Sequence, residues 1–175
     1  MKAKSIPVII AVALAVWGGF AIAAQDRFML KVPDGLAFSD FKGYDTWQAV
    51  APSATEGSIK AILANPVMVK AYRDGVPGNG KPFPEGSKIV KIEWSKKKSS
   101  ESPYFVEIPD ALVSVAVIEK DTGRFADTNG WAYAKFDYDA ASGSFKPEGS
   151  GHQCGYACHT AVKAKDFIFT AYPKR

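Results

Sequence analysis

Short apolar segments separated by polar, glycine- and proline-containing stretches run along this chain, and one of them alternates between apolar and polar residues. The period of two is clearest over residues 88–94, and it predicts a strand. One face of that strand carries Val90, Ile92 and Trp94, and the other carries Ile89, Lys91 and Glu93. Residues 58–64 have some strand character, and further strands are expected at 111–119, 131–138 and 167–172.

Helices are expected to be few and short. Asp45 is placed to cap a helix over residues 46–50. Pro66 suits the first turn of a second helix, which runs to about Asp74 and is ended by Gly75.

The remaining segments are expected to be connections and one further helical region. Residues 75–86 contain three prolines and four glycines, so they can form neither a helix nor a central strand. Residues 154–165 are expected to contain a helical turn or two, and loops are expected at 33–43, 121–130 and 140–151. The pattern predicts an α+β fold: a single antiparallel, sheet-rich domain with a few short helices.

The N-terminus resembles a secretory signal peptide. Lys2 and Lys4 precede an apolar run over residues 6–22, and the Ala21-Ile22-Ala23 pattern is acceptable to a signal peptidase. The alternative is an uncleaved membrane anchor, but the run is short for a span of about 20 residues and lacks a basic flank after it. We expect a signal peptide over 1–23, a mature domain over 24–175, and a periplasmic location if the source has two membranes.

Charge argues against a nucleic-acid partner. Two of the 22 basic residues and none of the 18 acidic residues lie in the predicted signal, so the mature chain carries a net charge of only +2. The one basic cluster, residues 96–98, is short and not interleaved with aromatic residues, and we expect it to be a solvated turn.

The segment from Cys154 to His159 has the form C-x-x-x-C-H, one residue longer than the usual haem-attachment motif. Covalent haem requires two thiols and an imidazole for the iron, so Cys154, Cys158 and His159 predict haem c. We expect Gly155 to absorb the extra residue through a looser turn. The alternatives are a local disulfide, which leaves His159 without a role, and a zinc site, which requires four ligands where only His152 is near besides these three.

No second axial ligand is evident. His152 lies on the same side as the attachment segment and is expected to be a loop residue. Met29 and Met68 have no recognisable ligand context and are expected to pack in the core. An open sixth position favours small-ligand chemistry over electron transfer alone.

Three groups of residues resemble the cytochrome P-460 family, which includes the cytochrome c′-beta proteins. They are Phe83-Pro84-Glu85-Gly86 leading into 89–94, Arg124-Phe125 with Gly130-Trp131-Ala132-Tyr133, and Cys158-His159 followed by 166–170. The resemblance implies an exported, dimeric, sheet-rich protein that carries haem c with an open distal site. It implies as partners a small gaseous or nitrogen-oxide ligand, a soluble electron-transfer protein and a second copy of the chain.

Hydroxylamine-oxidising members of that family cross-link a strand lysine to the haem, and the similar position here is Lys91. Without the resemblance, Lys91 would be read as a lysine on the polar face of a strand. Those members also carry a distal glutamate, and the corresponding position here falls near Ala116, which cannot transfer a proton.

Three hypotheses follow. The first is a haem protein that binds nitric oxide or a related ligand at an open iron. The second is a hydroxylamine-oxidising enzyme with Lys91 cross-linked, which Ala116 disfavours. The third is a domain without haem that contains a Cys154–Cys158 disulfide, which His159 disfavours.

Overall fold

The computed structural model describes residues 25–148 and 151–175, without the side chains of His152 and Cys154. The predicted signal peptide lies outside the described residues. No helix in the described part of the chain is long and apolar enough to cross a bilayer.

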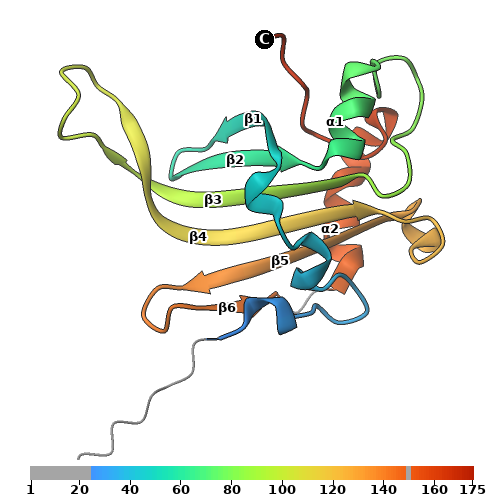
Figure 1. The fold of residues 1–175 in the computed structure, drawn as a ribbon, viewed down its shortest axis with the longest axis horizontal. Coiled ribbons are helices and arrows are strands. Elements are labelled where there is room, and N and C mark those ends of the chain that lie inside the picture. Colours follow the sequence, from blue (N-terminus) through green and yellow to red (C-terminus); the bar gives the residue numbers. More distant parts are fainter. Residues whose placement is uncertain (1–24, 149–150) are drawn as a thin grey trace, which may run out of the picture.

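The described residues form one sheet of six strands, each antiparallel to the next in chain order (Figure 1). The strands are β1 (Gln48–Ala54), β2 (Ser58–Ala64), β3 (Lys88–Lys98), β4 (Glu107–Lys120), β5 (Trp131–Asp139) and β6 (Ser144–Pro147). Antiparallel neighbours can be joined by short hairpins, but β2 and β3 are joined by residues 65–87, which contain a helix. The predicted α+β fold is confirmed.

Two α-helices and five short 3₁₀ turns accompany the sheet within the described residues. They are α1 (Pro66–Arg73), α2 (Gly151–His159), η1 (Arg27–Met29), η2 (Phe38–Phe41), η3 (Tyr44–Thr46), η4 (Ala126–Thr128) and η5 (Thr160–Lys165). The prediction for α1 is confirmed: the Asn65 side chain accepts a hydrogen bond from the Met68 N–H at 3.1 Å, and Pro66 begins the helix.

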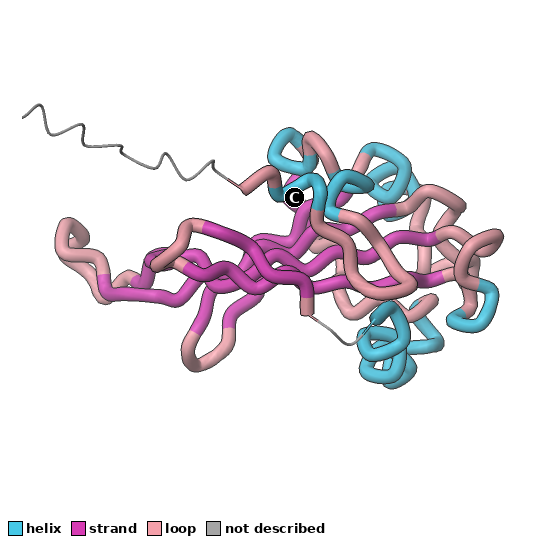
Figure 2. The backbone as a smooth tube through the Cα atoms, turned by 90° about the horizontal axis from the view of Figure 1, so that it is seen from below, coloured by secondary structure: helices cyan, strands magenta, loops and turns pink. Residues whose placement is uncertain are grey.

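Each face of the sheet is covered by a different part of the chain, as the edge-on view shows (Figure 2). One face packs against the N-terminal segment through Leu36, Phe38 and Phe41, which are fully buried. The other face packs against α1 and the C-terminal segment. The predicted alternation in β3 is confirmed, because Val90 belongs to the first core and Ile89 to the second.

The predicted helix over 46–50 is wrong, because the chain is already extended from Gln48 as β1. Pro52 makes this segment a poor candidate for a central strand, but β1 lies at the edge of the sheet, where a proline is tolerated. The register between β1 and β2 shifts between Ala49 and Ala51, so the segment also lacks a regular period.

The predicted strand over 167–172 is also wrong. Asp166 and Phe167 have φ values of 50° and 62°, which turn the backbone away from an extended path. The apolar residues of this segment pack individually instead: Ile168 is buried in the core, and Tyr172 stacks on Tyr72 at 5.5 Å between ring centroids.

The strands β3 and β4 continue beyond the rest of the sheet as a two-stranded ribbon (Figure 1). Residues 96–98 belong to this ribbon, which contradicts the prediction of a solvated turn. Two of these lysines are neutralised by the opposite strand, with Lys96 2.9 Å from Glu107 and Lys97 2.7 Å from Asp110. The strand β6, predicted as loop, has only four residues and lies at the other edge of the sheet.

Candidate functional site

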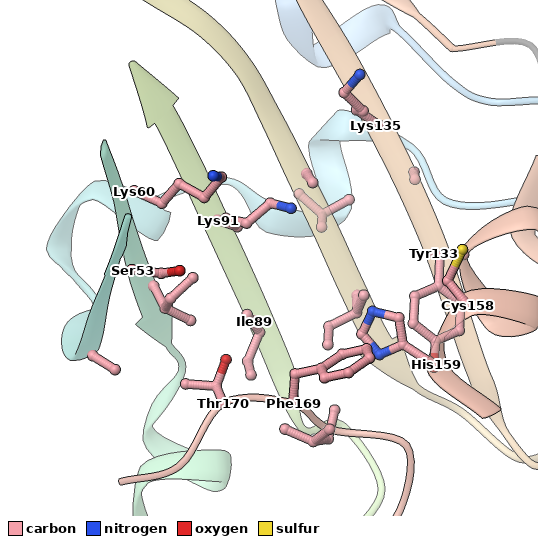
Figure 3. A pocket seen from close by; sticks show the side chains of 18 of the residues that line it. Ser53, Lys60, Ile89, Lys91, Tyr133, Lys135, Cys158, His159, Phe169 and Thr170 are labelled. Atoms are coloured by element: carbon pink, nitrogen blue, oxygen red, sulfur yellow. The ribbon is translucent and has the colours of Figure 1, made fainter. Parts of the chain in front are cut away.

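A cavity of about 960 Å³ lies against the sheet face that packs on the C-terminal segment (Figure 3). The strands β1 to β5 contribute residues to its floor, and α2 and residues 168–171 form another wall. Much of its lining is apolar, including Ile62, Ile89, Ala116, Ile118, Ile168 and Phe169. The size and the apolar lining suit a large organic cofactor with a few polar anchors.

The strand register places four side chains in one row across the floor of the cavity. Ile62 pairs with Lys91, Lys91 with Ala116, and Ala116 with Lys135. All four residues line the cavity. The structure therefore brings the predicted site residue Lys91 next to Ala116, with a second lysine on the far side of the alanine.

His159 ends α2 and reaches the cavity from the wall opposite Lys91 (Figure 3). Its Nδ1 lies 2.5 Å from the carbonyl oxygen of Phe167. Because a carbonyl can only accept, Nδ1 carries the proton, and the other ring nitrogen, Nε2, keeps its lone pair for a metal. The imidazole is packed between rings, with centroids 4.6 Å from Tyr133 and 4.9 Å from Phe169.

Burial lowers the pKa of His159, and the hydrogen bond to Phe167 opposes this effect. The positive charge of Lys91 lowers the pKa further. The neutral imidazole that a metal requires is therefore the favoured form.

The second cysteine of the motif, Cys158, is an exposed free thiol at the cavity wall. Cys154 lies one turn earlier in α2, and its side chain is outside the described part of the structure. Residues four apart in a helix share a face with β-carbons about 5–6 Å apart, whereas a disulfide requires about 3.5–4.5 Å. The helix therefore suits two separate thiols better than a local disulfide.

Gly155 is needed for close packing, not for the looser turn that the sequence led us to expect. It lies inside α2, and a β-carbon added to it would lie 2.3 Å from Cβ of Tyr133. Only glycine lets the helix approach β5 this closely. The extra residue of the motif is accommodated by regular helix, so the expectation about Gly155 is corrected.

Burial lowers the pKa of Lys91, and the charges of Lys60 and Lys135 add to this effect while Glu93 opposes it. A lowered pKa increases the fraction of neutral amine, which is the nucleophilic form. The side chain points into the cavity (Figure 3). Lys91 is therefore a cavity lysine and not only a residue on the polar face of a strand.

Several cavity residues were not identified from the sequence. Lys60 lines the cavity and is paired with Glu93 at 3.2 Å, and Glu148 lines it near Lys135 at 3.9 Å. Lys60 follows the alternation of the 58–64 strand, so its face could have been predicted. Glu148 lies in a segment predicted as loop, where no pattern indicates a direction.

The other candidate ligands do not line the cavity where they are described. Met68 is fully buried in the core, as predicted, whereas Met29 is 81% exposed, which contradicts the expectation of core packing. The side chain of His152 is outside the described part of the structure. Among the described residues, no group of three or more His, Cys, Asp or Glu side chains could hold a metal ion on its own.

Comparison with known protein families matches residues 41–170 to Cytochrome P460. The chain belongs to the cytochrome P460 family. The resemblance seen in the sequence is thereby confirmed, and family membership implies a haem cofactor with its iron. No curated protein matches the chain.

The site of this cytochrome P460 family member fits a haem on its own geometry. The cavity is large and apolar, one imidazole has its Nδ1 committed to a carbonyl, and an exposed thiol lies directly before that imidazole in the chain. These are the features that an axially ligated haem requires.

Proposed function

We propose that the chain is an exported c-type haem protein that binds nitric oxide or a related small nitrogen-oxide ligand. The observation that carries this proposal is the state of His159, whose Nδ1 donates to the Phe167 carbonyl and whose ring lies at the cavity wall. In this proposal His159 coordinates the iron, and Cys154 and Cys158 attach the haem through thioethers.

The haem, when bound, supplies an iron centre that takes small ligands. The protein supplies the rest: the ring contacts of Tyr133 and Phe169 fix the imidazole plane, and the apolar residues of the lining limit water beside it. His159 is the one imidazole among the described cavity residues, and no methionine is among them. This supports a sixth position that is open to an external ligand.

Ala116 supports ligand binding over turnover. It lies on the cavity floor beside Lys91, so neither a carboxylate nor any other proton-transferring group is present at that position. A base must lie within hydrogen-bond reach of the proton that it removes. The methyl group of alanine leaves space for a diatomic ligand and cannot accept a proton from it.

The experiment is an absorption titration of the purified ferrous protein with nitric oxide. We expect an ordinary c-type Soret band that changes in one step on addition of the ligand. The variant His159→Ala should lose the coordinated spectrum of the unliganded protein. A protein that carries no covalent haem, or whose spectrum does not respond to nitric oxide, would refute the proposal.

Hydroxylamine oxidation is the second candidate function, and two described residues favour it. Lys91 lies in the cavity with a lowered pKa, and Glu148 places a carboxylate on the cavity lining. If Lys91 is cross-linked to the haem, the Soret band should be red-shifted and steady-state oxidation of hydroxylamine should be measurable with an artificial electron acceptor. Loss of that rate in Glu148→Gln would identify the base.

We also propose that the mature protein is a periplasmic homodimer that exchanges electrons with a soluble protein. The connection at the end of the β3–β4 ribbon supports an interface with a second copy of the chain, because the side chains of Tyr104 and Phe105 are 79% and 75% exposed there. An isolated two-stranded ribbon is only marginally stable in water. Lys96 and Lys97 are already paired with carboxylates of the opposite strand. Packing of a second copy against the ribbon would therefore not leave these two lysines as unpaired buried charges.

Light scattering after size exclusion tests this interface. Tyr104→Ser with Phe105→Ser should convert the dimer to a monomer, whereas Val67→Ser, which removes an exposed apolar residue from α1, should not. A double variant that stays dimeric would rule out the ribbon as the interface.

A further inference from the structure

The carbonyl group that holds His159 belongs to a turn with an uncommon backbone. Asp166 and Phe167 both have left-handed φ values, of 50° and 62°. Side chains other than glycine rarely adopt this conformation, and two in succession persist only where the surrounding structure determines them. The position of the Phe167 oxygen, and with it the orientation of the imidazole, therefore depends on what fixes this turn.

The carboxylate of Asp166 is the fixed point of the turn. It accepts two hydrogen bonds from the Lys120 ammonium, at 2.9 and 3.0 Å, and one from the backbone N–H of Phe83 at 2.8 Å. The two charged side chains are nearly buried, with exposed fractions of 7% for Lys120 and 12% for Asp166. Charge-assisted hydrogen bonds in such a site are stronger and more directional than those at the surface.

Lys120 is itself held from several directions. It is the last residue of β4, its N–H donates to the Ser87 carbonyl at 2.9 Å, and its own carbonyl accepts from Gly86 at 2.9 Å. Its ammonium lies 5.0 Å from the centroid of the fully buried Trp131 ring. The end of β4 therefore holds the Lys120 ammonium in a fixed position beside the Asp166 carboxylate, which fixes the turn.

We propose that Lys120 and Asp166 are positioning residues for the proximal iron ligand. The ion pair fixes the left-handed turn, the turn places the Phe167 carbonyl, and the carbonyl fixes the proton of His159 on Nδ1 and aims Nε2 into the cavity. Second-shell acceptors of this kind also raise the basicity of a ligating histidine. This inference rests on the proposed role of His159 as the iron ligand.

The decisive variant is Asp166→Asn in the haem-loaded protein. Asparagine adopts left-handed angles as readily as aspartate and has nearly the same shape, so the change removes the charge without altering the preference of the backbone. The resonance Raman Fe–His stretch of the ferrous protein should shift to lower frequency, and the reduction potential should rise, because the hydrogen bond to Nδ1 is weakened. Lys120→Arg keeps the charge and the donors, so it should retain the wild-type band.

Glu119→Gln is the matched control. Glu119 is the neighbouring residue of β4, points to the opposite face, and forms a partly buried pair with Lys88 at 3.0 Å, with exposed fractions of 10% for Glu119 and 21% for Lys88. This variant should lose stability while its Fe–His band and potential stay unchanged.

A wild-type Fe–His band in Asp166→Asn would overturn the inference, because the pair would then be structural only. If that variant does not accumulate, Lys120→Gln compared with Lys120→Arg decides in the same way: equal bands refute the inference, and a shift in the glutamine variant alone supports it. Absence of any Fe–His band in the wild-type protein would instead refute the role of His159, and with it the proposed function.

Discussion

Gly155→Ala should push α2 away from β5. The new β-carbon would lie 2.3 Å from Cβ and 2.5 Å from Cγ of Tyr133, whereas ordinary contact begins at 3.4 Å. The helix must therefore move by roughly 1 Å at this point. The nearest of these atoms is the β-carbon of Tyr133, which stays in place when the tyrosine side chain rotates. Rotation of that side chain therefore cannot relieve the overlap.

The size of the effect follows from two opposing terms. Overpacking of a core commonly costs about 1–3 kcal/mol, and a clash that no side chain can avoid belongs at the upper end. Alanine regains about 1 kcal/mol as the better helix former. The net loss of about 2 kcal/mol corresponds to a fall of roughly 4–8 °C in Tm for a domain of this size.

Thermal unfolding of the haem-loaded protein measures this loss, and its absorption spectrum reports on His159, four residues further along the same helix. We expect both to change. Gly57→Ala is the control, because a β-carbon there meets nothing within 4 Å. A Gly155→Ala protein with the Tm and spectrum of the wild type would refute the close contact between α2 and β5.

Three further predictions concern the cavity. Cys158→Ala should abolish most covalent haem, as measured by haem staining after acid-acetone extraction, and full retention of haem would contradict the attachment. Burial lowers the pKa of Lys91, so a charged Lys91 costs stability below that pKa, and the cost disappears as the pH rises toward the ordinary lysine value of about 10.4. The stability advantage of Lys91→Met in urea unfolding should therefore shrink between neutral pH and about pH 10, and an advantage independent of pH would show that Lys91 is not desolvated. Ala116→Glu should raise hydroxylamine oxidation about 100-fold if Lys91 is cross-linked, whereas fast turnover by the unmodified protein would show that another group, such as Glu148, already serves as base.

The sequence correctly predicted the four central strands, although only β3 shows a clear period of two; β4 has both faces against a core and reads as a nearly continuous apolar run. The prediction failed at β1 and at residues 167–172. The edge strand β1 contains Pro52 and a register shift, and residues 167–172 are rich in apolar residues without being extended. In both segments the local pattern reflects packing against distant residues, which a window of neighbouring residues does not contain.

The candidate site was predicted as far as it is local in sequence. The succession of Cys158 and His159, and the position of Lys91 on one face of a strand, can be read from the chain itself. The Phe167 carbonyl, the Tyr133 ring and Glu148 reach the site through the fold alone, and nothing in their own segments indicates that destination. The role of Gly155 was misread for the same reason, since its constraint comes from β5.

The row formed by Lys91, Ala116 and Lys135 has a consequence for how this protein can evolve. Every alanine codon becomes an aspartate or glutamate codon by one change at its second base. A carboxylate at position 116 would lie between the ammonium groups of Lys91 and Lys135. Both would stabilise its negative charge, so the folded protein should tolerate the substitution. A single base change at position 116 would then separate a ligand-binding protein from one that turns over substrate, with the rest of the fold unchanged. Descendants of one gene could gain or lose turnover by that change.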